Sequence, residues 1–295
     1  MDKPIVVIAG ASGFIGGHLT LFLREQGWTV RTLSRSDKMD FKWDPTRESI
    51  DEGVFADADV VVNLAGRSIL APRWSESFKR ELVNSRVQTT QFLVDKLLSL
   101  ETKPSVLFNA SAIGYYGTKA FSCTEGSAAG NGFLASLCVE WEKATEAAST
   151  AGIRVINGRF GPVLCRSGGM LGAMVTPFKL CLGGALGAGK QLISWISMPD
   201  LLRSICFVIE REDLSGPVNF VSPQPVTNQN FSTALAKCLN RPSIFNVPAS
   251  ILRLVLGEMA DEVLLSSSEV IPEKLIKAGF DFKHPSLEKA LRDLI

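Results

Sequence analysis

A glycine-rich turn near the start of the chain restricts its fold more than any other feature. Residues 10–16 read Gly-Ala-Ser-Gly-Phe-Ile-Gly, directly after an apolar run at 5–9 and before a helical pattern over 14–26. A buried strand, a tight glycine turn and a helix N-terminus in this order form a phosphate-binding site, because backbone N–H groups can approach the anion. The alternative is a glycine-rich turn without a ligand. We predict a dinucleotide site with contacts from Gly10, Ser12, Gly13, Phe14, Ile15 and Gly16.

The first half of the chain alternates between strand and helix patterns. Further apolar strands are expected at 29–33, 60–64, 105–109 and 154–157, and long helices at 77–100 and 135–149. This alternation predicts βαβ units and a doubly wound parallel sheet of the Rossmann type, hence the α/β class. After residue 163 the texture changes to a glycine-rich segment and then to helices separated by prolines, with a strand at 216–221 returning to the sheet.

A chain of 295 residues has the length of two ordinary domains. We predict a nucleotide-binding domain at 1–164, joined by a returning segment at about 195–222. Residues 165–194 and 223–295 would form a smaller, discontinuous substrate domain.

Composition excludes several classes of protein. The 31 basic and 30 acidic side chains leave a net charge of +1, so a nucleic-acid partner is not expected. No run of about 18 apolar residues exists, so no membrane-spanning helix is expected. Six scattered cysteines without a C-x-x-C pair indicate free thiols in a reducing cytoplasm, and no metal site. Only two histidines, His18 and His284, are present, which leaves little material for a His-based zinc site or a Ser-His-Asp triad.

The end of the second expected strand bears on the choice of cofactor. Enzymes that use NAD place an acidic residue there to bind the ribose 2′-hydroxyl. This chain has Ser34 and Arg35, whose hydroxyl and guanidinium suit a 2′-phosphate, whereas Asp37 is too far along to be the obvious ribose ligand. The alternative is a solvated surface arginine. We therefore predict NADP as the cofactor.

The spacing G-x-x-G-x-x-G at 10–16 resembles the short-chain dehydrogenase/reductase superfamily. Several further segments match an atypical subgroup of that superfamily: Asn-Leu-Ala-Gly at 63–66, Gly-Tyr-Tyr-Gly at 114–117, F-L-A-x-x-C-x-x-W-E at 133–142 and Ile-Ser-Trp-Ile-Ser at 193–197. These are the epimerase-family proteins, similar to sugar-nucleotide epimerases, which carry a C-terminal domain of unknown function that 248–294 resembles. The resemblance covers essentially the whole chain.

The resemblance implies further cofactor contacts. Residues 63–66 look like the turn whose backbone lines the adenine ribose, and the end of the sixth strand is where relatives hold the nicotinamide amide. The alternative for residues 63–66 is a plain exit from a strand into a loop. For Glu81 and Arg86 it is a solvated pair on an outer helix face, and for the segment at Val163 it is a loop-forming proline. The implied contacts are Leu64, Ala65, Gly66, Glu81, Arg86 and Val163.

The same resemblance exposes a departure in the catalytic residues. Ser111 matches the active-site Ser or Thr, with an uncertainty of one residue caused by the doubled tyrosine. Relatives then carry Y-x-x-x-K, in which Lys lowers the pKa of Tyr for proton transfer. Here Leu134 and Cys138 occupy those positions. Tyr115 or Tyr116 is the substitute acid that we expect, and the alternative for both is an aromatic pair that packs the pocket floor.

Two functions remain open at this point. The first is an NADP-dependent oxidoreductase or epimerase that acts on a small polar metabolite, and the second is a non-catalytic NADP-binding sensor or regulatory protein. In relatives Trp195 and Asp200 line the substrate cleft, although an aromatic between isoleucines is more often core. The superfamily also implies a homodimer by analogy.

Overall fold

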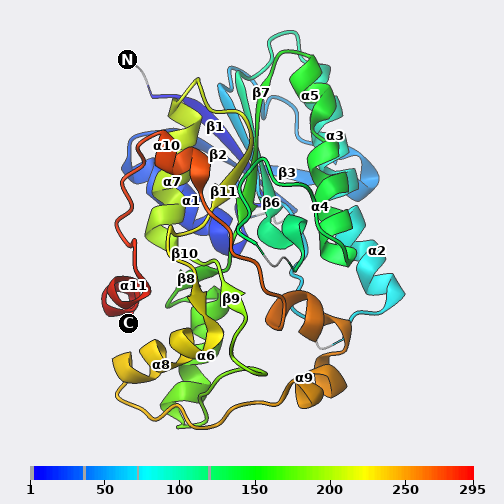
Figure 1. Ribbon diagram of the computed structural model, residues 1–295. Helices are drawn as coiled ribbons and strands as arrows, with labels where there is room; N and C mark the ends of the chain where they lie inside the picture. The colour runs from blue at the N-terminus through cyan, green and yellow to red at the C-terminus, as the bar shows by residue number, and fades with distance from the viewer. Residues whose placement is uncertain (1–2, 36–37, 72, 119–120) are drawn as a thin grey trace.

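The fold is built on one large sheet. The computed structural model describes residues 3–35, 38–71, 73–118 and 121–295. Its eight-stranded sheet has the order β11-β7-β6-β5-β1-β2-β3-β4 and is parallel apart from the β3–β4 hairpin (Figure 1). The strands are β1 Ile5–Ala9, β2 Thr29–Ser34, β3 Phe41–Asp44, β4 Ser49–Ile50, β5 Val60–Asn63, β6 Val106–Ala112, β7 Arg154–Phe160 and β11 Gly216–Phe220. The predicted α/β class and Rossmann-type sheet are confirmed, and within this sheet the β3–β4 hairpin was not predicted.

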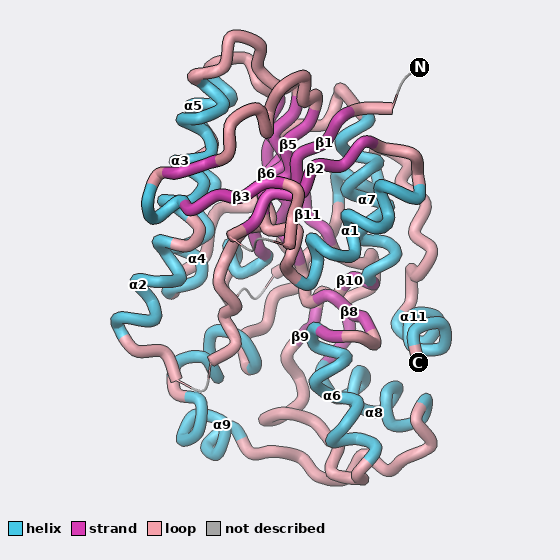
Figure 2. Tube along the Cα trace, turned by 180° about the vertical axis from the view of Figure 1, so that it is seen from behind, coloured by secondary structure: helices cyan, strands magenta, loops and turns pink. Residues whose placement is uncertain are grey.

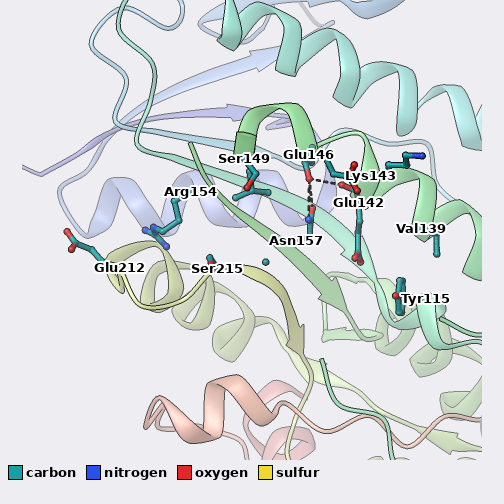
Figure 3. Close-up of a pocket in the computed structure, with 13 residues that line it drawn as sticks. Tyr115, Val139, Glu142, Lys143, Glu146, Ser149, Arg154, Asn157, Glu212 and Ser215 are labelled. Atoms are coloured by element: carbon teal, nitrogen blue, oxygen red, sulfur yellow. Dashed lines mark hydrogen bonds between the residues drawn. The ribbon is translucent and has the colours of Figure 1, made fainter. Parts of the chain in front are cut away.

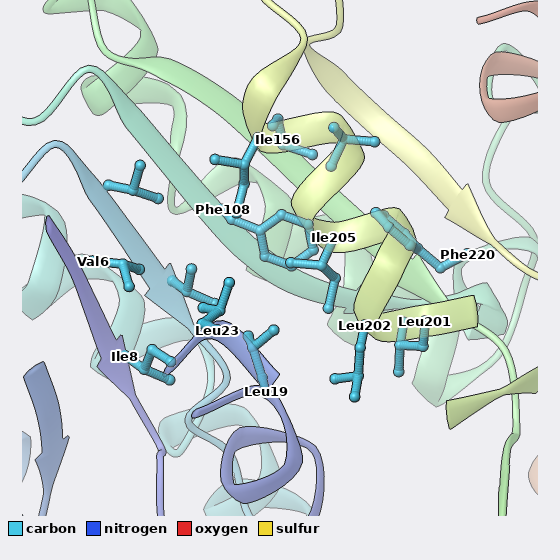
Figure 4. Packing of buried hydrophobic residues seen from close by; sticks show 14 of the residues in the cluster. Val6, Ile8, Leu19, Leu23, Phe108, Ile156, Leu201, Leu202, Ile205 and Phe220 are labelled. Atoms are coloured by element: carbon cyan, nitrogen blue, oxygen red, sulfur yellow. The ribbon is translucent and has the colours of Figure 1, made fainter. Parts of the chain in front are cut away.

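Helices cover both faces of this sheet. One face carries α1 Phe14–Glu25, α7 Met198–Glu210 and α10 Glu273–Lys277, and the other carries α2 Glu76–Asn84, α3 Val87–Leu98, α4 Phe133–Lys143 and α5 Glu146–Thr150 (Figure 1). The strands alternate their side chains between the two faces. Val6, Ile8 and Phe108 therefore pack against α1 and α7, as Figure 4 shows, while Val7 and Leu107 join a second cluster with α3.

The remaining elements form a smaller lobe below the carboxyl ends of the strands (Figures 1 and 2). It contains two small sheets, β8 with β10 and β9 with β12. Its elements are β8 Val163–Cys165, α6 Gly169–Lys179, β9 Leu192–Ile193, β10 Ile196–Ser197, β12 Val226–Thr227, α8 Asn228–Cys238, α9 Ala249–Leu256, a π-helical turn Ala260–Leu264 and α11 Leu287–Leu294. The division into two domains stays a prediction.

Two predicted helices are wrong in length. The pattern over 77–100 splits into α2 and α3 at Ser85 and Arg86, where Arg86 departs from helical geometry with φ −114° and ψ −64°. The pattern over 135–149 splits into α4 and α5, because the Thr145 hydroxyl donates to the Glu142 carbonyl at 2.6 Å and competes with the backbone ladder. Apolar periodicity persists across both breaks, so the sequence alone does not reveal them.

The order of the strands locates a candidate binding crevice. The order reverses between β1 and β5, which are neighbours in the sheet: the chain continues from β1 to β2 on one side and from β5 to β6 on the other. Ligands of doubly wound sheets bind at the carboxyl ends of strands beside such a switch point. Within the part of the chain that the structure describes, no helix is long and apolar enough to cross a membrane. Nor do the described His, Cys, Asp and Glu residues gather into a group that could hold a metal ion.

Candidate functional site

The glycine turn lies at this switch point and leaves no room for side chains. Gly10 has φ +82°, and a Cβ there would lie 2.8 Å from the carbonyl oxygen of Leu64 and the amide of Ala65, which follow β5. A Cβ on Gly16 would overlap the Gly10 carbonyl oxygen and lie 2.9 Å from the Cα of Ala11. The two glycines therefore permit the close approach of α1, β1 and the turn after β5.

The N-terminus of α1 has the properties of an anion site. Gly13 precedes the helix in an extended conformation, no side chain caps it, and its first turn holds no acidic residue. The leading amides of a helix have no intrahelical partner and carry a partial positive charge. Phe14, the first residue of the helix, is 36% exposed, and its ring lies beside Gly168 and Gly169. The turn thus fits a phosphate or pyrophosphate group.

The end of β2 approaches the same turn. The hydroxyls of Ser12 and Ser34 are 2.8 Å apart, and Arg35 is exposed beside them. Hydrogen bonds from Thr46 and the charge of Arg47 lower the pKa of Asp44, and the charge of Arg35 makes a smaller contribution in the same direction. The Arg35 guanidinium therefore lies within electrostatic reach of the Asp44 carboxylate. Asp37, which we judged too far along to bind the ribose, lies outside the described residues.

Among the predicted cofactor contacts, Ala65, Gly66 and Arg86 lie together after β5, whereas Glu81 lies apart from them. The amide of Ala65 donates to Asn63 at 3.2 Å, and a Cβ on Gly66 would touch the Arg86 guanidinium at 3.5 Å. That guanidinium donates to the Arg67 carbonyl at 2.8 Å and lies 5.1 Å from the ring centre of Trp141, and burial lowers its pKa. Arg86 therefore faces the crevice turn.

Glu81 does not join Arg86. It is half exposed on α2 and forms an ion pair with Arg67. Val163 begins β8 with 9% exposure and pairs in register with Ile196, and a Cβ on Gly161, two residues earlier, would overlap the backbone of Ser194. These positions were implied by resemblance, and their roles remain predictions.

Ser111 is held by a buried ion pair that sequence reasoning missed. Its hydroxyl donates to Glu142 Oε1 at 2.7 Å, and Arg159 donates to both oxygens of the same carboxylate at 2.8 Å. Arg159 is only 3% exposed and lies beside Ser111 in the β6–β7 register. Burial alone would lower the pKa of Arg159, but the hydrogen bonds and charge of Glu142 raise it above its usual range.

The two tyrosines differ in their surroundings. Tyr116 is fully buried; its hydroxyl donates to Asn219 at 2.8 Å and accepts from Arg159 at 2.9 Å, and burial raises its pKa to about 12. A phenol with both partners satisfied and no exposed surface is a poor proton carrier near neutral pH. Tyr115 is partly exposed and stacks on Arg159, with the guanidinium carbon 3.4 Å from the ring centre. The geometry thus argues against a catalytic Tyr116 and keeps Tyr115 as the candidate.

Leu134 and Cys138 lie on α4 beside these residues. A Cβ on Gly114 would touch Leu134 at 3.3 Å and the Cys138 sulfur at 3.9 Å. Burial raises the pKa of the Cys138 thiol to about 11, so this thiol is neutral near pH 7. The carboxylate of Glu262, from the π-helical turn, accepts from the amides of Phe133 and Leu134 at 3.3 and 3.1 Å. A side chain from the C-terminal part of the chain therefore accepts hydrogen bonds from the first amides of α4.

Two residues expected near a substrate are core residues. Trp195 is fully buried among apolar side chains of the lower lobe, as its sequence context favoured. Asp200 is 1% exposed and accepts from the amides of Lys283 and His284 at 2.8 Å each. Trp195 belongs to the core of the lower lobe and Asp200 joins α7 to the segment before α11, and neither has the exposure that a substrate contact needs.

A surface groove of about 650 Å³ runs alongside the polar cluster of Ser111, Glu142 and Arg159, over β7 and the start of β11 (Figure 3). Tyr115 and Glu142 line one part of it, and Arg154 and Glu212 line another. No local motif announces the groove or the Glu142–Arg159 pair. The available signal was an arginine near the end of a predicted sheet strand, since β7 reads Arg-Val-Ile-Asn-Gly-Arg-Phe and its second arginine is Arg159.

Comparison with known proteins agrees with this geometry. Residues 6–220 match the model of the NAD dependent epimerase/dehydratase family, and residues 247–294 match a domain of unknown function. An epimerase family protein of Mycobacterium bovis is 43% identical over 99% of this chain and 97% of its own length.

Two solved structures are similar over nearly the whole chain. The human epimerase family protein crystallised with NADPH has a TM-score of 0.90 and 30% identity, and 98% of each chain is covered. A nucleoside-diphosphate sugar epimerase from Corynebacterium glutamicum has a TM-score of 0.82 and 32% identity, over 99% of this chain and 58% of that one. The chain therefore belongs to the NAD dependent epimerase/dehydratase family.

Proposed function

We propose that the chain binds NADP(H) at the carboxyl edge of its sheet. The observation that carries this proposal is the turn at Gly10 and Gly16, where added Cβ atoms would strike backbone. Such packing leaves the uncapped N-terminus of α1 open to a pyrophosphate. The human relative crystallised with NADPH supports the same assignment.

The preference for NADP rests on the end of β2. There Ser34 is bonded to Ser12, and Arg35 is exposed with no carboxylate at positions 34 and 35. A guanidinium binds a 2′-phosphate through charge-assisted hydrogen bonds, whereas a ribose 2′-hydroxyl prefers a carboxylate acceptor. The family's description as NAD dependent leaves both cofactors open, so the local chemistry decides our choice.

We expect NADPH to bind more tightly than NADH, with the preference depending on Arg35. The change Arg35→Asp removes the phosphate-binding cation and supplies a ribose acceptor, and should shift the NADPH-to-NADH affinity ratio by about 100-fold, or about 3 kcal/mol, the scale of two charge-assisted contacts. Fluorescence titration of both cofactors measures the ratio. Arg47→Asp makes the same charge change at a neighbouring exposed arginine near Asp44 and should leave the ratio close to wild type. Equal effects of the two substitutions would contradict the assignment.

We further propose that the bound cofactor serves a reaction on a small polar metabolite, for which NADP(H) supplies the hydride. The chain's own contribution would be to orient the substrate and to move a proton from Tyr115, whose ring lies on the Arg159 guanidinium. A second candidate function is cofactor sensing without chemistry. It is favoured by a specific observation, since the Ser111 hydroxyl is committed to Glu142 and is 2% exposed. For its location we propose the cytoplasm, and for its assembly a homodimer by analogy with the superfamily.

Hydride transfer distinguishes these two functions. Incubation with NADPH deuterated at the transferable position, together with pools of polar metabolites, should yield a deuterated product detectable by mass spectrometry. Tyr115→Phe should lower the transfer rate by about 100-fold, the usual contribution of a positioned general acid, with little change in NADPH affinity. Tight NADPH binding without any transfer would instead support the sensor.

A further inference from the structure

A second cluster of reactive groups lies beside α1, the helix that follows the phosphate turn, which is the glycine turn at residues 10–16. Cys165 ends β8 with its sulfur 3.8 Å from Nε2 of His18, which lies on α1, and 3.1 Å from the hydroxyl of Ser167. The Ser167 hydroxyl is 3.3 Å from the same Nε2. Cys165 and His18 are partly exposed and Ser167 is exposed, so the cluster lies at the protein surface.

A backbone contact sets the role of the histidine. His18 Nδ1 lies 2.8 Å from the carbonyl oxygen of Phe14. A carbonyl only accepts hydrogen bonds, so Nδ1 carries the proton and the neutral ring presents the lone pair of Nε2. That lone pair faces the thiol and the serine hydroxyl. The arrangement is therefore a nucleophile, a base and a group that orients the base.

We propose that Cys165 is an activated thiol and a site of modification by small-molecule disulfides. His18 Nε2 takes the thiol proton, either directly or through the Ser167 hydroxyl. The Cys165 sulfur then attacks one sulfur of the disulfide, a new S–S bond forms, and the original S–S bond breaks. The leaving thiolate takes the proton from the His18 imidazolium, so one thiol is consumed and one is released.

The position of this thiol couples it to the phosphate turn. His18 is bonded to the carbonyl of Phe14, and the Phe14 ring contacts Gly168 and Gly169 in the turn that follows Cys165. A bulky group on the sulfur needs space between β8 and α1, and so displaces His18 or the turn 166–169. This consequence rests on the proposed NADP(H) site, because Phe14 begins the helix whose N-terminus would bind the phosphates. Modification of Cys165 should then weaken NADPH binding.

Thiol activation is tested without the cofactor. Iodoacetamide labelling followed by peptide mass spectrometry gives a rate for each cysteine. Cys165 should react about tenfold faster than Cys181, which is also partly exposed, because His18 Nε2 lies beside the Cys165 thiol and can accept its proton as the sulfur attacks. Cys206, whose pKa burial raises to about 12, should be slower still.

His18→Asn is the matched variant. Its side-chain amide still donates to the Phe14 carbonyl but lacks the base at Nε2, so Cys165 should fall to the rate of Cys181 while the melting temperature stays near wild type. Equal rates for Cys165 and Cys181 in the wild-type protein, or a rate for Cys165 that His18→Asn leaves unchanged, would overturn the activation.

The coupling is tested with oxidised glutathione. The mixed disulfide at Cys165 should raise the NADPH dissociation constant about tenfold, within the usual range of coupling between sites. Treated Cys165→Ser protein should keep the affinity of the untreated protein. Unchanged affinity of the modified wild-type protein would overturn the coupling, whereas failure of the unmodified protein to bind NADPH would overturn the proposed function and leave the labelling result standing.

Discussion

Replacing Arg159 with methionine is expected to lower the free energy of unfolding by about 3–5 kcal/mol, the cost of removing one partner from a buried ion pair. The guanidinium is 3% exposed and forms two contacts of 2.8 Å with Glu142. It also donates to the Tyr116 hydroxyl at 2.9 Å, so its loss removes the cationic partner of the Glu142 carboxylate, which keeps only the Ser111 hydroxyl, and removes the donor to the phenol. Equilibrium unfolding in urea measures the change.

The chain offers a matched control in Arg211. Arg211 makes the same pair of 2.8 Å contacts, with Asp213, but the two side chains are 41% and 61% exposed. Arg211→Met should therefore cost much less stability than Arg159→Met, because solvent screens an exposed ion pair. Replacing both Arg159 and Glu142 by apolar residues should recover part of the loss, because no unpaired charge remains. An Arg159→Met penalty no larger than that of Arg211→Met would show that burial adds nothing to this pair.

The second large effect is expected at the phosphate turn. Gly16→Ala places a methyl group against the Gly10 carbonyl and 2.9 Å from the Cα of Ala11, so α1 must move away from the turn. We expect a loss of stability of about 1–3 kcal/mol from overpacking. NADPH affinity should fall at least tenfold, since each displaced charge-assisted contact costs about 1.5–3 kcal/mol. Thermal unfolding and fluorescence titration provide the two readouts.

Gly17 is the control for this substitution. It is the next residue of α1, and a Cβ there would find its nearest neighbour, the Ala11 carbonyl oxygen, at an ordinary 3.7 Å. Gly17→Ala should be neutral or stabilising by up to about 1 kcal/mol, because alanine favours helix more than glycine does. NADPH binding should survive. If Gly16→Ala and Gly17→Ala behave alike, close packing at Gly16 does not govern the site.

Much of the fold could be read from the sequence, because its signals are local. The apolar runs predicted β1 and β11, and Gly10, Gly13 and Gly16 marked the turn between strand and helix. The family resemblance was also confirmed over most of the chain. Element boundaries were less accessible, since apolar periodicity continues past Arg86, whose φ is −114°, and past Thr145, whose hydroxyl donates to the Glu142 carbonyl.

The candidate site divides along the same line. By itself the sequence determined the phosphate turn and the chemical groups available to it, since a strand, three spaced glycines and a helix start are contiguous. Only the tertiary structure decided what those groups do. It pairs Arg159 of β7 with Glu142 of α4, buries Tyr116 completely, and brings His18 beside Cys165. Burial and the partner of a charge depend on contacts between residues far apart in the chain, and local patterns do not encode such contacts.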